Sequence, residues 1–231
     1  MASEPAASPR FFVLTQDALG SRYDIEVDEL EPINLGNAAC CPRCGDPIGM
    51  KQWMPPYRVE LLLHGEEFGD FIKASGDDLL VSEHFARAFK EEGLTGLEGF
   101  HPVEVVRVRR KRRGAKPSHV PQYLAVTACF GRAAVEVTRS RIRYKKPPTC
   151  EVCRSEGVDS IHGFTLEPGT WQGEDIFRPR GLFGDLVVSE RFARFVERHG
   201  FTHMRLVPTE QLVWDPLGLG PPETQGGARG R

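Results

Sequence analysis

The stretch DDLLVSEHFARAFKEEGLTG at residues 77–96 recurs in altered form as GDLVVSERFARFVERHGFTH at residues 184–203. The two stretches align without a gap at an offset of 107 residues. A match of this length in a single phase predicts an internal repeat. The aligned pairs include Ser82 with Ser189, Phe85 with Phe192, Ala86 with Ala193, and Gly93 with Gly200.

Each copy of this stretch predicts a short strand that leads directly into a helix. Leu79–Val81 and Leu186–Val188 are runs of β-prone apolar residues. In each copy a serine then takes the N-cap position, a glutamate lies in the first turn, and phenylalanines recur at helical spacing before a glycine. We therefore expect the phenylalanines in the core and not at a ligand site.

Other segments predict strands around these helices. Strands are expected after the helices, at VEVVRV from Val103 and MRLV from Met204, and near the N-terminus at RFFVLT and RYDIEV. QYLAVTACF from Gln122 and AAVEVTRSRIRY from Ala133 predict a hairpin that turns at FGRAA, with Cys129 as an inert buried thiol. The expected fold class is α+β, with antiparallel sheets and short helices.

Two CxxC motifs supply the candidate metal ligands. Cys41 and Cys44, followed by Gly45, form the first motif, and Cys150 and Cys153 form the second. Zinc prefers four thiolates in a tetrahedron, and each CxxC turn aims two sulfurs at one point. The motifs lie much farther apart than the usual 15 to 20 or so residues, but nearly at the offset of the repeat. We therefore expect one structural Zn²⁺ per chain, held by all four cysteines in a zinc-ribbon-like site that joins two pseudo-repeated β-α-β units.

Other interpretations of the cysteines stay open. The thiols could be empty or oxidised, or one pair could be a redox CxxC, although redox motifs occur in a βαβ context that these loops lack. Cys40 is a spare thiol that could exchange with Cys41 as a ligand.

Composition along the chain predicts one folded domain between two tails. Residues 1–9 are small and polar and residues 216–231 are rich in glycine and proline, so both are expected to be disordered. Residues 10–215 are expected to form a single α+β domain. It would consist of two repeat-like lobes, at about 36–108 and 146–213, with a basic hairpin at 103–146.

Charge is segregated along the chain. The net charge is −2, from 30 basic and 32 acidic residues, yet residues 102–146 hold 13 basic residues and two acidic ones. The rest of the chain therefore has 17 basic and 30 acidic residues, a net charge of −13. Such a distribution affects partners and association rates more than the fold.

The basic segment has several interpretations. It could follow the phosphates of a nucleic acid, with Tyr123, Phe130 and Tyr144 available to stack on bases. It could equally be a protein-binding surface, or a solvated hairpin that keeps an edge strand from aggregating. The candidate contact residues are Arg109, Arg110, Lys111, Arg112, Arg113 and Lys116.

The sequence contains none of the familiar catalytic motifs. There is no nucleophile elbow, Walker loop, dinucleotide-binding GxGxxG or HExxH, so we expect neither catalysis nor a small-molecule substrate. No apolar run approaches the roughly 18 to 20 residues that span a bilayer, and the N-terminus lacks the pattern of a secretory signal. These features predict a cytoplasmic protein without a membrane partner.

Several motifs together resemble the double-CXXCG motif proteins, a bacterial family. They are CPRCG at 41–45, CEVC at 150–153, SRYD at 21–24, PQY at 121–123 and two copies of VSExFAR. The resemblance covers nearly all of residues 10–213. It implies a small cytoplasmic protein stapled by zinc through the four CxxC cysteines, with a role as an immunity protein against a toxin exchanged between kin. Arg154 departs from the family pattern, which has glycine there.

Two functions follow from these observations. The first is a non-enzymatic interaction protein that binds and neutralises a cognate bacterial toxin. If that toxin were a nuclease, the acidic part of this chain could cover its basic active site with fast electrostatic association. The alternative is a zinc-ribbon-like nucleic-acid-binding protein that uses residues 107–146.

Overall fold

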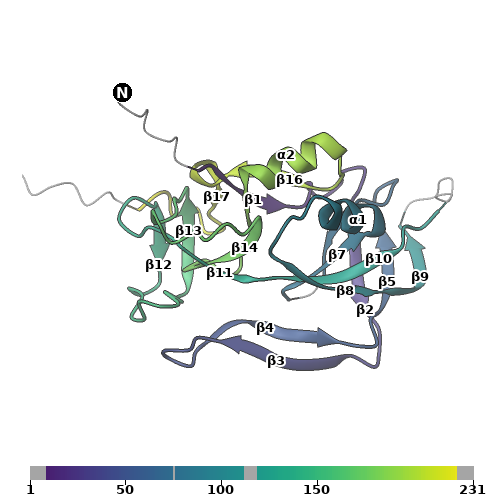
Figure 1. Ribbon diagram of the computed structural model, residues 1–231, viewed down its shortest axis with the longest axis horizontal. Helices are drawn as coiled ribbons and strands as arrows, with labels where there is room; N and C mark the ends of the chain where they lie inside the picture. The colour runs from purple at the N-terminus through teal and green to yellow at the C-terminus, as the bar shows by residue number, and fades with distance from the viewer. Residues whose placement is uncertain (1–8, 75, 112–118, 223–231) are drawn as a thin grey trace, which may run out of the picture.

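The computed structural model describes residues 9–74, 76–111 and 119–222. It is mostly β with two short α-helices, α1 (Glu83–Glu91) and α2 (Glu190–His199), and the predicted α+β class is confirmed. The helices lie beside each other on one side of the molecule, and a long two-stranded ribbon runs along the opposite side (Figure 1). Among the described residues, no helix has the length and apolar character needed to cross a bilayer.

The strands form five sheets. The five-stranded sheet has the order β11 (Phe130–Ala134), β14 (Ile176–Arg180), β15 (Val187–Ser189), β1 (Phe11–Thr15), β16 (Arg205–Pro208). The four-stranded sheet has the order β6 (Phe71–Lys73), β7 (Asp78–Ser82), β10 (Tyr123–Ala128), β8 (Leu97–Pro102). The smaller sheets are β12 (Ile142–Tyr144), β13 (Val158–His162), β17 (Val213–Trp214); β2 (Ile25–Glu29), β5 (Arg58–Leu63), β9 (Glu104–Arg110); and the ribbon of β3 (Asn34–Cys40) and β4 (Pro47–Met54). A short 3-10 helix, η1 (Thr209–Gln211), precedes β17.

The two largest sheets share a strand order and a register. The order β14-β15-β1-β16 matches β6-β7-β10-β8, with every pairing antiparallel, and in both sheets a helix follows the second strand directly. Strand β1 therefore completes the sheet of α2, whereas β10 completes the sheet of α1. The matched pairings are Phe11 with Ser189 and Tyr123 with Ser82, Phe12 with Pro208 and Leu124 with Pro102, and Ile176 with Val188 and Phe71 with Val81.

The helices begin and end as their sequences predict. The Oγ atoms of Ser82 and Ser189 accept hydrogen bonds from the backbone N–H three residues later, at 3.1 and 3.2 Å. Gly93 and Gly200 have φ of +61° and +66°, a conformation that costs glycine little. The phenylalanines of both helices interleave in one cluster, so their predicted place in the core is confirmed.

The basic segment differs from the predicted hairpin. Strand β9 pairs with β5, β10 pairs with β7 and β8, and FGRAA is itself a strand, β11, that pairs with β14. Both edges of β10 are therefore occupied, and neither β9 nor β11 pairs with it in the described residues. Strands β1 and β10 also lie outside the two predicted lobes, whose limits stay a prediction.

The predicted tails lie largely outside the described residues. Residues 216–222 are described, however, and the backbone N–H groups of Leu219 and Gly220 donate to the Asp215 carboxylate at 2.9 and 2.8 Å. This part of the C-terminal segment therefore forms a hydrogen-bonded turn.

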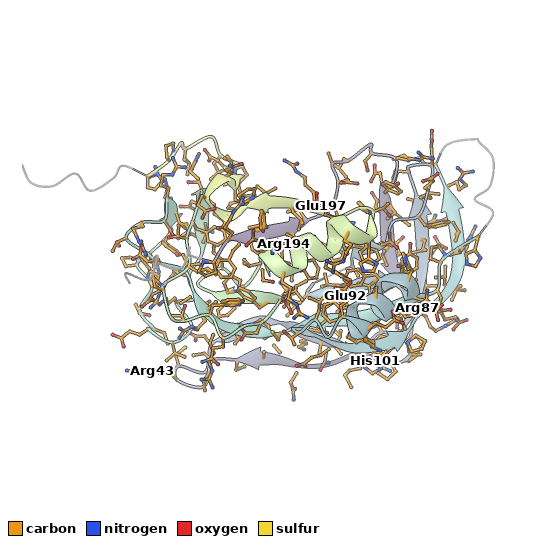
Figure 2. The ribbon with its side chains drawn as sticks, turned by 45° about the horizontal axis from the view of Figure 1, so that its top comes forward. Arg43, Arg87, Glu92, His101, Arg194 and Glu197 are labelled. Atoms are coloured by element: carbon orange, nitrogen blue, oxygen red, sulfur yellow. The ribbon has the colours of Figure 1, made fainter. Side chains whose placement is uncertain are left out.

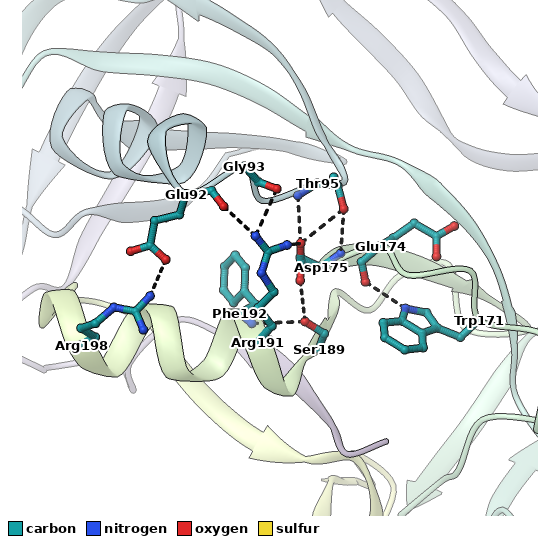
Figure 3. Close-up of polar contacts among 10 residues, drawn as sticks. All are labelled: Glu92, Gly93, Thr95, Trp171, Glu174, Asp175, Ser189, Arg191, Phe192 and Arg198. Carbon is teal, nitrogen blue, oxygen red and sulfur yellow. Dashed lines mark hydrogen bonds and ion pairs between the residues drawn. The ribbon is translucent and has the colours of Figure 1, made fainter. Parts of the chain in front are cut away.

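Asp175 links the N-terminal end of α2 to the segment that follows α1. Its carboxylate accepts from Ser189 Oγ at 2.8 Å, from the Thr95 backbone N–H at 3.1 Å and from Arg191 at 2.9 Å (Figure 3). Ser189 caps α2, whereas Thr95 follows α1. Asp175 is 2% exposed, so these donors replace the water that its carboxylate loses on burial.

Asp70 makes the same arrangement with the roles of the helices exchanged. It accepts from Ser82 Oγ at 2.6 Å, and from the backbone N–H and Oγ1 of Thr202 at 2.9 Å each. Ser82 caps α1 and Thr202 follows α2. Each helix start is thus tied to the segment that follows the other helix.

Asp175→Ala should lower the free energy of unfolding by about 3 kcal/mol, because it leaves several buried donors unpaired. Glu197→Ala, on the exposed side of α2 (Figure 2), is the control and should change stability by less than about 0.5 kcal/mol. Denaturant unfolding measures both values. Equal effects of the two substitutions would contradict a structural role for the Asp175 contacts.

Asp78, at the start of β7, makes stability depend on pH. Its pKa is raised to about 6, first because burial disfavours the carboxylate and then because Glu29 and Asp77 lie near. Because the Asp78 carboxyl group loses its proton less readily in the folded protein than in the unfolded chain, the folded protein is most stable below the unfolded-state pKa. It loses stability as the pH rises through 6.

Asp78→Asn should therefore stabilise the protein above pH 6, by up to about 3 kcal/mol at pH 8, while the advantage disappears near pH 4. Unfolding curves of both proteins from pH 4 to 8 measure this difference. A pH-independent difference would contradict the assignment.

Candidate metal centre

Four cysteines from distant parts of the chain come together at one point. Cys41 and Cys44 lie in the turn between β3 and β4, and Cys150 and Cys153 lie between β12 and β13. All four Sγ atoms lie within 4.8 Å of one another. Across the two motifs, Cys41 Sγ lies 3.9 Å from Cys150 Sγ and Cys44 Sγ lies 3.7 Å from Cys153 Sγ.

The first CxxC turn is closed by backbone hydrogen bonds at the end of the β3–β4 ribbon. The Cys41 N–H donates to Asp46 O at 2.8 Å, and the Gly45 N–H donates to Cys41 O at 2.9 Å. Gly45 has φ of +78°, so the chain can fold back after the second cysteine. The Arg43 N–H then lies 3.4 Å from Cys41 Sγ, while the Arg43 side chain projects outward (Figure 2).

The second turn has the same shape although it lacks the glycine. The Arg154 N–H donates to Cys150 O at 2.9 Å, and Arg154 has φ of +55°, which is uncommon for a residue other than glycine. Its side chain donates to Val135 O at 2.8 Å and pairs with Glu167 at 2.6 Å. These contacts hold arginine in the conformation that glycine has in the first turn.

Arg180 supports the second turn from β14. Its guanidinium donates to Val152 O, inside the CxxC motif, at 3.2 Å, and to Arg132 O at 2.8 Å. Sequence reasoning noticed Arg154 only as a departure from a family pattern and missed Arg180 altogether. The presence of arginine at the glycine position was the one available signal that this turn is held by side chains.

The thiols of each motif differ in acidity. A hydrogen bond from the Cys44 backbone lowers the pKa of Cys41 to about 6, and the Cys153 backbone likewise lowers the pKa of Cys150. Burial raises the pKa of Cys153, and the pKa of Cys44 is also raised, despite an opposing hydrogen bond from the Asp46 backbone. Each motif thus has one thiol with a lowered pKa, and a bound cation would favour the thiolate at all four.

The sulfur positions fit a tetrahedral metal site. Metal–sulfur bonds of about 2.3 Å in a tetrahedron separate neighbouring sulfurs by about 3.8 Å. The 3.7 and 3.9 Å distances lie on either side of that value. The four cysteines could therefore hold one metal ion.

The two remaining cysteines lie outside this cluster. Cys40 is exposed and its Sγ lies 3.6 Å from Ala38 O. Cys129 is half-buried in the segment between β10 and β11, and burial raises its pKa to about 11, which keeps the thiol protonated.

Among the described residues, at least one of the predicted basic contact residues faces carboxylates of neighbouring strands. Arg109 pairs with Glu60 and, at 3.7 Å, with Asp28 of the neighbouring strands, and Arg107 pairs with Glu60 at 3.7 Å. Arg110 and Lys111 are also described, and the Lys111 backbone N–H donates to Leu63 O at 3.1 Å. The other three, Arg112, Arg113 and Lys116, lie outside the described residues.

Comparison with protein-family models gave no match, and neither did comparison with curated proteins. The fold and the cysteine cluster define the chain as an α+β protein with four cysteines placed to hold one metal ion.

Protein purified without chelator should contain one metal ion per chain, measured by elemental analysis. Cys44→Ser should lose the metal and lower the melting midpoint by roughly 5 to 10 °C, equivalent to about 2 to 3 kcal/mol, because the remaining core is large.

Cys40→Ser is the matched control and should keep both metal and midpoint, since Cys40 is not in the cluster. A metal-free wild-type protein, or loss of metal from Cys40→Ser, would contradict the proposed ligand set.

Proposed function

We propose that the chain is a non-enzymatic, zinc-stapled interaction protein that binds and neutralises a cognate bacterial toxin. The observation that carries this proposal is the convergence of four thiols from two motifs 109 residues apart. Four protein ligands complete a tetrahedral shell, so a metal there has no open position for a substrate. Such a site stabilises a structure and leaves function to the protein surface.

Zinc is the metal that suits this ligand set best. Thiolate ligands in a tetrahedron select zinc or iron–sulfur clusters among common biological metals, and a single ion held by two CxxC turns is typical of structural zinc. One such ion would connect the β3–β4 ribbon to the loop before β13. It would close a chain segment of more than 100 residues and so lower the entropy of the unfolded state.

The two largest sheets, each with its helix, are best explained as two copies of one structural unit. The shared strand order and register of the two largest sheets support this, as do the equivalent contacts of Asp70 and Asp175. In this interpretation each copy contributes one CxxC motif and exchanges its first strand with the other copy.

Charge favours a basic protein partner over a nucleic acid. Outside residues 102–146 the chain has a net charge of −13, which would speed association with a basic surface. In contrast, Arg107 and Arg109 of β9 already face carboxylates of β5 and β2, which reduces the positive field that phosphates would meet. The family resemblance in the sequence motivates the identification of that partner as a toxin.

Co-expression of the chain with the product of the neighbouring gene tests the proposal. We expect the two proteins to co-purify as a complex, and growth to be restored to cells that express the toxin. The Cys44→Ser variant should protect less well because its fold is less stable, whereas Cys40→Ser should protect fully. Continued toxicity without co-purification would overturn the proposal.

A further inference from the structure

The two CxxC turns differ in how the rest of the chain supports them. The first turn lies at the end of the β3–β4 ribbon, where residues 42–46 are all exposed. Its backbone hydrogen bonds stay within residues 41–46. Among the described residues, the sulfurs of Cys41 and Cys44 make the only polar contacts of this turn with residues outside the ribbon. The cysteines are therefore its main polar attachment to the rest of the protein.

The second turn is attached to the body of the protein by two arginine side chains. Arg154 donates to Val135 O at 2.8 Å and pairs with Glu167 at 2.6 Å. Arg180 donates to Val152 O, inside the motif, at 3.2 Å. Val135 is 0% exposed and its N–H donates to Arg180 O at 2.9 Å, so the groups that hold this turn belong to the core.

The two arginines also lie close to each other. A Cβ atom added at Gly181, the residue after Arg180, would lie 3.7 Å from Arg154 Cβ. Burial lowers the pKa of Arg180, and the neighbouring charge of Arg154 lowers it further. Two guanidinium groups are thus held side by side next to the turn, at a cost in electrostatic energy.

The charge of a metal-bound cluster offsets this cost. A divalent ion held by four thiolates leaves the cluster negatively charged overall. Positive groups beside such a cluster are attracted to it, and they reduce the repulsion among its thiolates. The arginines therefore fit the bound form of the site in both geometry and charge.

We propose that Cys150 and Cys153 form a preformed half-site that binds the metal first, and that Arg154 and Arg180 are the positioning residues that hold it. The first motif then closes over the ion from the end of the ribbon. Ligands that are already in place lose less conformational freedom on binding than ligands that must first be ordered. This proposal rests on the metal centre of the proposed function, but not on the identity of the partner.

Variants that keep only one motif test the order of binding. Cys41→Ser with Cys44→Ser leaves the second motif, and Cys150→Ser with Cys153→Ser leaves the first. Titration with Co²⁺, followed by thiolate-to-cobalt charge-transfer absorption, should show at least roughly tenfold tighter binding to the second motif. Equal affinities, or tighter binding to the first motif, would overturn the proposal.

Arg180→Met tests the positioning role in the protein with all four cysteines. It removes the donor to Val152 O and should weaken Co²⁺ binding roughly tenfold, as is typical when a residue that orients a metal ligand is lost. Arg43→Met is the matched control and should leave the affinity unchanged. It removes the same charge from the first turn, but the Arg43 side chain projects outward (Figure 2) and has no hydrogen bond or ion pair within the described part of the chain.

Equal weakening by the two substitutions would mean that charge alone matters, and the positioning role would be wrong. A melting curve of the metal-free protein checks that Arg180→Met folds. If it does not, Arg154→Gly decides, because glycine accepts the positive φ and removes only the side-chain contacts. An unchanged affinity of that variant is the contrary result.

Hydrogen exchange in the protein stripped of metal compares the two turns directly. Each turn is closed by an equivalent bond of 2.9 Å, from Gly45 N–H to Cys41 O and from Arg154 N–H to Cys150 O. Removal of the metal should accelerate exchange at Gly45 at least roughly tenfold and at Arg154 less than about threefold. Similar acceleration at both amides would contradict a preformed second turn.

The outcomes separate this proposal from the proposed function. If the four-cysteine protein binds metal but the two single-motif variants bind it equally, the half-site is wrong and the metal centre stands. If metal binds in the expected order but the neighbouring gene product does not co-purify, the toxin hypothesis fails and the half-site stands. If neither the wild type nor any variant binds metal, the metal centre is wrong, and the half-site with it.

Discussion

Two carboxylates hold this structure in one arrangement. Asp70 and Asp175 each bind the serine that caps the helix of their own sheet and the threonine that follows the other helix. Asp175 is buried and Asp70 is partly buried, so a shift of either helix would leave a carboxylate short of hydrogen bonds. The phenylalanines of α1 and α2 pack in one cluster between the helices, and burial of their apolar surface stabilises the fold. The contacts of Asp70 and Asp175 fix how the two helices lie relative to each other.

The sheet of α2 is assembled from distant parts of the chain. Strand β1 pairs with β15 and β16, which lie near the other end of the chain, so this sheet is complete only when both ends have folded. The cysteine cluster adds a third connection, at the far end of the β3–β4 ribbon, between segments that are 109 residues apart. A metal ion there would connect the ribbon, which runs along the side of the molecule opposite the helices (Figure 1), to the loop between β12 and β13.

The two largest sheets differ at one edge. In the five-stranded sheet β11 pairs in parallel with β14, on the side away from β15. In the four-stranded sheet β6 pairs only with β7 among the described residues, and β2 lies against it. The segment after β1 lines an acidic cavity together with the end of β6. Two sheets with the same strand order and register can therefore have different surroundings at one edge.

Local sequence determined the elements whose signals are short-range: the capped helices, the strands before them and the CxxC turns. The spacing of the two CxxC motifs, close to the offset of the recurring stretch, also predicted that the motifs pair. The sequence did not predict strand β8, because LEGFHP lacks an alternation of apolar and polar residues and needs Gly99 at φ of +95°. Only the tertiary structure decided which strands pair, because hydrogen-bond partners in a sheet lie far apart in sequence and carry no local signal. For the same reason FGRAA became a strand and not a turn, and the positive φ of Arg154 depends on contacts with Val135 and Glu167 that no local pattern contains.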